Sequence, residues 1–569
     1  MQIKKLFGVN WPTRDEIRLL EKNLSVKDNL FLVFFSVLFI IGFGGIASRV
    51  NNNFLVSIPL HGGSHSEGVL GSPRTINPVF ASSDADRDMT QLIYTGLMRF
   101  DDEGNVQKDL AEDYSISEDG LVYTFTLKKG LKFHDGKDLT TEDVLFTIKT
   151  VQNPLAKSPK RINWEGVSIE VIDERTISFV LEKPYGAFIE NTTIGIIPKH
   201  IWEDIAVEDM SLYKTNLEPI GSGPYKFEKI KRDSNDIPRE INLSSFDRYS
   251  QGEPYINSFT MKFYDNEQDL IKALRQGSVD AIHSVSGEEA LSLEGNYEVT
   301  SIRLPRVFGM FFNQNKNSMF GDKAVTEAIE KAIDKNELVN IALSGYGVPV
   351  YGPRPIDTEG EAGTIEEANE ILEKAGYVAG DDGTRTKKTK EKEIKLSFAI
   401  STGDIDELKK SAEYIRDRLS LLGISVEIRV FDIGDLNQNV IKPRDYEALL
   451  FGEVIQSDYD LYSFWHSSER NDPGLNVSLY TNSKVDKSLE EIIKTVDTEK
   501  VKELSDSIKE TIVSERPAIF LYSPNLIYVR SRGSEVKSQI NRVRDASSRF
   551  SSVSKWYIEQ EKVWNIFVK

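Results

Sequence analysis

The sequence predicts an α/β fold for most of the chain, preceded by one membrane-spanning helix. Alternating apolar positions, typical of strands, are mixed along the chain with apolar positions three and four residues apart, typical of helices. The composition, 39% hydrophobic and 28% charged, is that of a water-soluble globular protein. One long apolar stretch near the N-terminus departs from this average. The 569 residues are enough for about four domains of ordinary size.

The apolar stretch is long enough to cross a membrane. Residues 29–48 contain no charged side chain, and a helix of this length spans about 30 Å, the thickness of bilayer hydrocarbon. Only Arg49 follows closely, whereas several basic residues precede the stretch: Arg14, Arg18, Lys22 and Lys27. We therefore expect a single-pass cell-membrane anchor, with residues 1–28 in the cytoplasm and the large remainder on the extracytoplasmic side.

A cleaved signal peptide is the alternative interpretation of the same stretch. Gly45, Ile46 and Ala47 place small residues where a signal peptidase would cut. The long N-terminal region and the length of the apolar run favour the anchor.

Residues 49–67 are expected to form a tether. They are polar and contain Gly and Ser, as flexible linkers do. His61 and His65 lie in this stretch without a further ligand at metal-binding spacing, so we expect them to be solvated and predict no metal site.

Charge and cysteine content exclude several classes of function. The net charge of −19 argues against a nucleic-acid partner, because phosphate backbones require a basic surface. The absence of cysteine removes disulfides, thiolate metal sites, cysteine catalysis and a lipidated cysteine anchor.

Beyond the tether, individual elements can be predicted in order. Residues 121–127 combine aromatic and β-branched residues and precede a turn, which indicates a strand. Thr140 followed by Asp143 is typical of a helix start. Residues 270–274 form one apolar helical face that Gly277 can end, and residues 279–282 begin a strand.

The clearest unit lies in residues 393–455. Residues 394–400 and 424–430 alternate as strands and flank a helical stripe ended by Gly423, and a short helix at 436–441 leads to a strand at 446–452. This β-α-β-α-β pattern predicts parallel strands, whose carboxyl ends are where ligands bind in open α/β sheets. Two loops leave these ends: residues 401–404 and residues 453–460. Asp404 alternatively caps the helix that follows it.

No catalytic motif is found, and no cofactor is expected. The chain contains no P-loop, no His-Glu-x-x-His and no calcium loop, and its histidines are widely spaced. His134 and Asp135 are adjacent and point in different directions, so a polar turn explains them better than a catalytic pair. Abundant carboxylates leave a carboxylate-dependent hydrolase as an alternative.

The C-terminal forty residues are basic. Residues 530–569 carry nine basic and four acidic side chains. We expect a solvated surface extension, with an anionic partner as the alternative.

Several short motifs together resemble family 5 of the substrate-binding proteins of ABC transporters, the peptide/nickel type. They extend in register over residues 68–530. The motifs are Gly71-Ser72-Pro73-Arg74-Thr75-Ile76-Asn77-Pro78, Ile93-Tyr94-Thr95-Gly96-Leu97, Asp109-Leu110-Ala111-Glu112, residues 123–136, Thr141-Glu142-Asp143-Val144, Ile197-Pro198-Lys199-His200, residues 219–225 and residues 345–353.

This resemblance implies a two-lobed, hinged periplasmic-binding-protein fold of class II with an extra subdomain. Lobe I would comprise residues 68–98, 216–306 and 516–569, the last including the C-terminal tail. Residues 99–215 would form the extra subdomain, lobe II, and residues 307–515 lobe III. The strand-end loops of the β-α-β-α-β unit would then face the cleft between lobes.

The resemblance also implies where the ligand binds. In peptide-binding members a carboxylate after the strand equivalent to 446–452 takes the peptide ammonium. That position falls near Ile455 here, which leaves Glu453, Asp458 or Asp460 as substitutes. From the opposing lobe we expect a polar segment, in which Asp84 alternatively caps a helix: Phe80, Ala81, Ser82, Ser83 and Asp84. Candidate aromatic walls are Tyr94, Phe308, Tyr459 and Trp465.

The function implied is that of an extracytoplasmic receptor that binds oligopeptides and delivers them to the permease of an ABC importer, with no catalytic role. The alternatives are the hydrolase and a solute sensor for glycans or chelated nickel.

Overall fold

The computed structural model describes residues 13–15, 18–19, 25–388, 393–532, 536–538 and 540–564. It divides into two compact units, one formed by the N-terminal residues to Leu60 together with the segment from Glu559, and the other by His61–Ile558.

The smaller unit contains one long helix and a pair of strands. Helix α2, Val26–Phe54, begins at Ser25, whose hydroxyl accepts from the Asp28 amide in a capping box. Among the described residues, Val26–Ile46 is the one helical segment long and apolar enough to cross a membrane, and its side chains are exposed. Strand β1, Leu55–Pro59, pairs antiparallel with β23, Gln560–Trp564.

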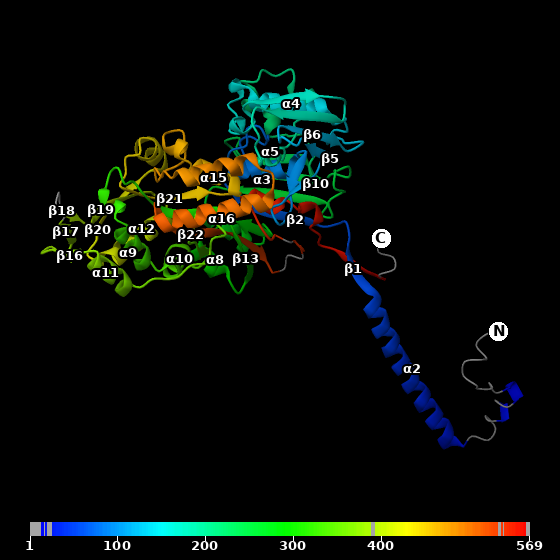
Figure 1. The fold of residues 1–569 in the computed structure, drawn as a ribbon. Coiled ribbons are helices and arrows are strands. Elements are labelled where there is room, and N and C mark those ends of the chain that lie inside the picture. The colour runs from blue at the N-terminus through cyan, green and yellow to red at the C-terminus, as the bar shows by residue number, and fades with distance from the viewer. Residues whose placement is uncertain are drawn as a thin grey trace. The chain divides into compact units, whose positions relative to one another are not determined.

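The larger unit is built around a sheet that has twelve strands within the described residues (Figure 1). Ten of them are neighbours in the order β20-β19-β21-β14-β22-β12-β2-β11-β10-β9, and β13 and β15 pair with β22. The bounds are β2 Ser64–Leu70, β9 Tyr225–Arg232, β10 Pro238–Ser245, β11 Ser258–Tyr264, β12 Ala281–His283, β13 Tyr297–Arg303, β14 Arg306–Phe312, β15 Gly347–Pro349, β19 Ser397–Gly403, β20 Ser425–Phe431, β21 Ala448–Val454 and β22 Ala518–Ser531.

The long strand β22 connects the two halves of this sheet. Its first half pairs with β14, and its second half pairs with β12 and β13. Residues far apart in sequence are thereby held in one hydrogen-bonded layer.

Strand β2 corrects the prediction of a tether over residues 49–67. Residues 64–67 belong to β2, which pairs in parallel with both β11 and β12. His65 and Glu67 are buried. The polar side chains of this stretch suggested a linker. His65 and Glu67 instead enter a buried charged cluster whose other members are distant in sequence and could not be predicted from this stretch alone.

The predicted β-α-β-α-β unit is confirmed. Strand β19 pairs in parallel with β20 and with β21, and α12, Asp406–Ser420, packs on these strands. Alternate residues of β21 enter two hydrophobic clusters, with Ala448 and Leu450 in one and Leu449 in the other. Asp404 does not cap α12, whose N-cap residue is Ile405.

Smaller sheets and the remaining helices complete the unit. Four strands order as β5-β6-β8-β7, namely Ala111–Ile116, Val122–Leu127, Thr176–Leu181 and Val167–Val171. The other pairs and triplets are β3 Met98–Phe100 with β4 Val106–Lys108, and β16 Val378–Ala379 with β17 Arg385–Lys388 and β18 Glu393–Lys395. The helices are α3 Asp84–Ile93, α4 Thr141–Gln152, α5 Phe188–Asn191, α6 Lys199–Trp202, α7 Glu267–Arg275, α8 Gly287–Leu293, α9 Lys323–Ala332, α10 Lys335–Leu343, α11 Ile365–Lys374, α13 Ile433–Asp435, α14 Leu461–Trp465, α15 Ser483–Lys494 and α16 Thr498–Glu515.

Local predictions in this region are confirmed. Strand β6 occupies the expected position, and α4 begins at Thr140, which forms a capping box with Asp143. Helix α7 ends at Arg275, followed by Gly277 with a positive φ of 68°.

The C-terminal segment corrects the expectation of a solvated extension. Phe550, Val553 and Trp556 are buried in the largest hydrophobic cluster. The Arg549 side chain has no exposed surface and contacts the carboxylates of Glu67 and Asp88. Arg549 and these apolar side chains therefore serve packing, whereas Arg532, Lys537, Arg542, Lys555 and Lys562 remain exposed.

Candidate functional site

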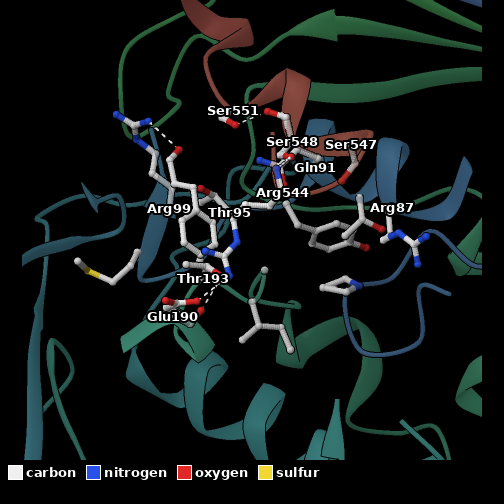
Figure 2. A pocket seen from close by; sticks show the side chains of 18 of the residues that line it. Arg87, Gln91, Thr95, Arg99, Glu190, Thr193, Arg544, Ser547, Ser548 and Ser551 are labelled. Atoms are coloured by element: carbon white, nitrogen blue, oxygen red, sulfur yellow. Dashed lines mark hydrogen bonds and ion pairs between the residues drawn. The ribbon is translucent and has the colours of Figure 1, made fainter. Parts of the chain in front are cut away.

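A cavity of about 370 Å³ lies within the larger unit and is lined by segments distant in sequence. Its charged lining residues are Arg87, Arg99, Asp109, Lys160, Glu190, Asp460, Arg544 and Asp545. Its polar lining residues include Thr90, Gln91, Tyr94, Thr95, Asn163, Tyr185, Asn191, Thr193, Tyr249, Gln456, Ser457, Ser547, Ser548, Ser551 and Ser554. Figure 2 labels ten of these side chains. The volume is near the lower end of the roughly 300–1,000 Å³ of ordinary ligand pockets, which suits a small solute.

Helix α3 supplies one wall of the cavity. Its start is fixed by Ser83, whose hydroxyl accepts from the Asp86 amide while the Asp86 carboxylate accepts from the Ser83 amide. Residues 87, 90, 91 and 94 follow at helical spacing and line the cavity. The opposite face, which includes Met89 and Leu92, is buried in the hydrophobic core.

Arg544 connects three parts of the chain across the cavity. Its guanidinium donates to the Glu190 carboxylate at 2.6 Å and to the Gln456 side-chain oxygen at 2.8 Å. It also lies 4.0 Å from the centre of the Phe100 ring. Figure 2 shows Arg544 and Glu190 pointing toward one another inside the cavity. Burial raises the pKa of Glu190, although Arg544 opposes this shift.

Asp460 follows strand β21 and retains one free oxygen. Its Oδ2 accepts from the backbone amides of Gln456 at 2.8 Å and Ser457 at 2.9 Å. Among the described residues, Oδ1 has no hydrogen-bond partner. Burial raises the pKa of Asp460, against the effect of those two amides and of Arg544.

Two further lining groups differ in how well they are satisfied. Asp109 accepts from Thr95, Ser250 and Gln251, so its buried carboxylate is fully engaged with neutral donors. The Tyr94 hydroxyl is buried and has no partner within the described residues, and burial raises its pKa. A bound solute could pair with Tyr94 without displacing a protein contact.

Comparison with known proteins identifies the family. Residues 105–475 match the family described as bacterial extracellular solute-binding proteins, family 5 middle. The chain belongs to this family.

Two relatives of this family 5 protein are named as binding proteins. The oligopeptide-binding protein AppA of Bacillus subtilis is 28% identical over 485 residues, which cover 82% of this chain and 87% of AppA. The glutathione-binding protein GsiB of Pectobacterium atrosepticum is 24% identical over 495 residues, covering 84% and 92%.

Solved structures show the same fold. B. subtilis AppA, in complex with a nonapeptide, matches with a TM-score of 0.65 at 26% identity and covers 88% of this chain and 100% of its own. The substrate-binding protein CtaP of Listeria monocytogenes matches with a TM-score of 0.73 at 24% identity, covering 88% and 99%. The two-lobed α/β fold and the family resemblance are thus confirmed, and this family 5 protein is a solute-binding protein rather than an enzyme.

The predicted segment at 80–84 lies beside the cavity. Within it Ala81 lines the cavity, as does Pro78 just before it, whereas Phe80 packs in the hydrophobic core. Ser82 accepts from Arg87 through its carbonyl. Ser83 caps α3, and Asp84, the first residue of that helix, pairs with Arg87. Asp84 was expected either to contact a ligand or to cap a helix. It lies at the start of α3, but Ser83 is the cap residue.

The predicted residues after β21 are separated by the fold. Asp460 lines the cavity, but Trp465 is fully buried in a hydrophobic cluster. Asp458 lies 3.7 Å from Arg354, and the Tyr459 hydroxyl donates to the Thr495 carbonyl.

Glu453 is buried away from the cavity lining. Neither carboxylate oxygen has a partner in the described part of the chain, and burial raises the pKa of Glu453 well above its usual range. Its side chain shares the face of β21 that carries Leu449, because residues two apart lie on the same side of a strand.

Sequence reasoning missed Lys160, Glu190 and Arg544 as lining residues. The basic excess of residues 530–569 was a signal for Arg544, but nothing local distinguishes it from Arg542. Lys160 and Glu190 reach the cavity only through the arrangement of the loops around η3, Arg161–Trp164, and helix α5.

Proposed function

We propose that this protein is the extracytoplasmic receptor of an ABC importer and binds short peptides in the cavity described above. The observation that carries the proposal is the cavity itself, a small space lined by segments from residues 78–109, 160–195, 456–460 and 544–554. It contains polar groups, such as the Tyr94 hydroxyl, that have no partner among the residues the structure describes and are open to a ligand.

The proposed lobes follow the same segments. With lobe I at 68–98, 216–306 and 516–569, lobe II at 99–215 and lobe III at 307–515, every lobe supplies residues to the cavity. A solute held there would contact all three and favour a closed arrangement of the lobes. A shift from 1:99 to 99:1 requires about 5.5 kcal/mol of differential affinity.

Asp460 is the proposed partner of the peptide ammonium. The family position near Ile455 is occupied by a buried apolar side chain, whereas Asp460 lines the cavity with a free Oδ1. A charge-assisted hydrogen bond at this oxygen is worth about 1.5–3 kcal/mol. The names of the relatives AppA and GsiB, which specify oligopeptide and glutathione binding, support a peptide ligand.

The proposed location is the extracytoplasmic face of the cell membrane, with α2 as the anchor. Residues 29–48 lie inside this helix. The proposed partner is the permease of the importer, to which the loaded receptor delivers its solute.

Native mass spectrometry of the full-length protein, purified in mild detergent, tests the proposal. We expect a co-purified peptide, and we expect that a tripeptide library raises the melting temperature of protein stripped of this ligand. Stabilisation by glycans or by a nickel–histidine complex, with no response to peptides, would refute the peptide assignment.

The role of Asp460 has its own test. Asp460→Asn should weaken binding of a peptide with a free N-terminus by about tenfold or more and leave binding of its N-acetylated form nearly unchanged. Asp404→Asn, at an exposed carboxylate outside the cavity lining, is the control. Equal losses for both peptides would refute ammonium recognition by Asp460.

A further inference from the structure

The cavity contains four cationic side chains, Arg87, Arg99, Lys160 and Arg544. Two of them are engaged by protein carboxylates. Arg544 donates to Glu190. Arg87 pairs with Asp84, donates to the Ser82 carbonyl at 2.6 Å and lies 3.9 Å from Asp545. These two arginines therefore already have countercharges.

Arg99 is directed elsewhere. Its Nη1 donates to the Phe100 carbonyl at 3.4 Å, and Figure 2 shows its guanidinium turned away from Arg544 and Glu190. Its Nε is buried without a partner. The guanidinium is therefore poorly placed to meet a solute that occupies the centre of the cavity.

Lys160 is the remaining cation. Its backbone amide donates to the Ser158 hydroxyl, and Ser158 donates to the Val79 carbonyl, so the start of this loop is anchored next to α3. The Lys160 side chain is half-buried. Within the described residues, no carboxylate lies within 4.0 Å of its Nζ and no hydrogen bond satisfies it.

The surroundings of Lys160 favour an added anion. Burial lowers the pKa of its ammonium, Asp545 acts against this shift and Arg87 adds to it. Asp545 is already shared, because its Oδ1 accepts from the Ser547 hydroxyl and the Ser548 amide and its Oδ2 lies near Arg87. A partly desolvated ammonium without its own countercharge is costly, and a ligand anion would relieve that cost.

We propose that Lys160 binds a carboxylate of the solute, at a point of the cavity distinct from Asp460. The inference rests on the proposed function and deepens it. Asp460 takes the ammonium and Lys160 takes the carboxylate, so the preferred solute is a short zwitterionic peptide with both termini free.

Binding of both peptide termini, by Asp460 and Lys160, would also select peptides by length. Asp460 follows β21, whereas Lys160 precedes η3. The two residues are 300 positions apart in sequence yet line one cavity of about 370 Å³. Two groups of opposite charge in one cavity of this size favour short peptides whose two termini can reach both. A longer peptide would leave one group unpaired, and a buried unpaired charge is penalised.

The test uses the full-length protein in detergent with a tripeptide library and the same library amidated at the C-terminus. Wild type should bind the free-acid peptides about tenfold or more tightly than the amides, because a charge-assisted hydrogen bond is lost on amidation. Lys160→Gln should weaken free-acid binding by a similar factor and leave amide binding unchanged. Lys160→Arg should retain the preference for free acids.

Lys149→Gln is the matched control, since Lys149 is an exposed lysine in the last turn of α4 in the same region and does not line the cavity. It should bind as wild type does. Equal affinity of wild type for acids and amides, or an equal loss of both in a folded Lys160→Gln protein, would overturn the Lys160 assignment while peptide binding stands. Failure of wild type to bind either library would overturn the proposed function itself, together with this inference.

Discussion

Replacing Arg549 with methionine should strongly destabilise the larger unit. The guanidinium makes four hydrogen bonds to carboxylates: Nε and Nη2 donate to Glu67 Oε2 at 3.0 and 2.8 Å, and Nη1 and Nη2 donate to Asp88 at 2.8 Å each. All three side chains have no exposed surface. Removing the cation therefore leaves two buried anions without a countercharge.

The magnitude follows from what remains in place. Tyr528 still donates to Glu67 at 2.6 Å, and the His283 ring lies 3.1 Å from Asp88. Glu67 thus keeps Tyr528 and the His65 ring, which lies 3.5 Å away, and Asp88 keeps His283. The loss is that of one member of a buried ion cluster, about 3–5 kcal/mol. Methionine retains part of the apolar packing of the arginine stem.

The loss of stability in Arg549→Met should depend on pH, in a direction set by the pKa shifts of Glu67 and Asp88. Burial would raise the pKa of Glu67, but Arg549, His65 and Tyr528 together lower it to about 2; the pKa of Asp88 is lowered as well, with Arg549 again opposing burial. In wild type, the contribution of these groups to stability is complete above about pH 4.5 and is lost as the pH falls toward about 2. In Arg549→Met, burial dominates, so protonation at low pH relieves the unpaired charges.

Urea unfolding followed by circular dichroism at pH 7 and pH 4.5 measures both effects. We expect a large deficit at pH 7 that becomes smaller at pH 4.5, and partial recovery in the triple variant that adds Glu67→Gln and Asp88→Asn. Arg429→Met removes a half-exposed pair with Glu427 and should cost at most about 1 kcal/mol. A deficit no larger than this control, or a deficit that grows on acidification, would refute the reasoning.

Three further substitutions test other parts of the structure. Glu453→Gln should be more stable than wild type at neutral pH. Because burial raises the pKa of Glu453, the free energy of unfolding of wild type falls by about 1.4 kcal/mol for each pH unit from about 4.5 up to the pKa in the folded protein. In urea unfolding, the difference in stability between the two proteins should therefore be smaller at pH 5 than at pH 7.5. Tyr94→Phe should change the free energy of unfolding by less than about 1 kcal/mol, since the hydroxyl has no partner among the described residues, and should weaken peptide affinity about 3- to 10-fold in calorimetry. Unchanged affinity would show that Tyr94 does not contact the peptide. The Gly186 amide donates to the Ile493 carbonyl at 2.9 Å, and Gly186→Ala would drive a Cβ into the Thr495 carbonyl oxygen beside this contact. The substitution should therefore lower peptide affinity and increase the radius of gyration of the peptide-bound protein in X-ray scattering. Wild-type values of both would show that the contact between these two segments has no role in closure.

Local patterns predicted the elements well, and failed where long-range contacts decide the environment. The strand and helix periodicity of residues 393–455 needed no distant partner, because each element buries its own apolar face. Strand β2 was missed for the opposite reason. Its polar residues His65 and Glu67 are buried only because Arg549, more than 480 residues away, supplies a countercharge.

In the candidate site, too, the sequence predicted the location of a loop but not the environment of its side chains. The loop after β21 was expected at a ligand-binding edge, and Asp460 does line the cavity, but the direction of each side chain was not predictable. Glu453 lies on the strand and points into the core, whereas Asp460 follows a turn that brings it back to the cavity. A difference of a few residues therefore decides which carboxylate lines the cavity.

By itself the sequence determined the apolar helix at the N-terminus, the α/β character and the membership of a solute-binding family, because each depends on composition, periodicity or motifs read within short segments. Only the tertiary structure decided which charges meet. Arg549 pairs with Glu67 and Asp88 in the core, and Arg544 joins Glu190 and Gln456 across the cavity. Lys160 lines the same cavity and has no such partner in the part of the chain that the structure describes. The physical reason is that electrostatic partners are set by distance and burial in space, which the order of residues along a chain does not specify.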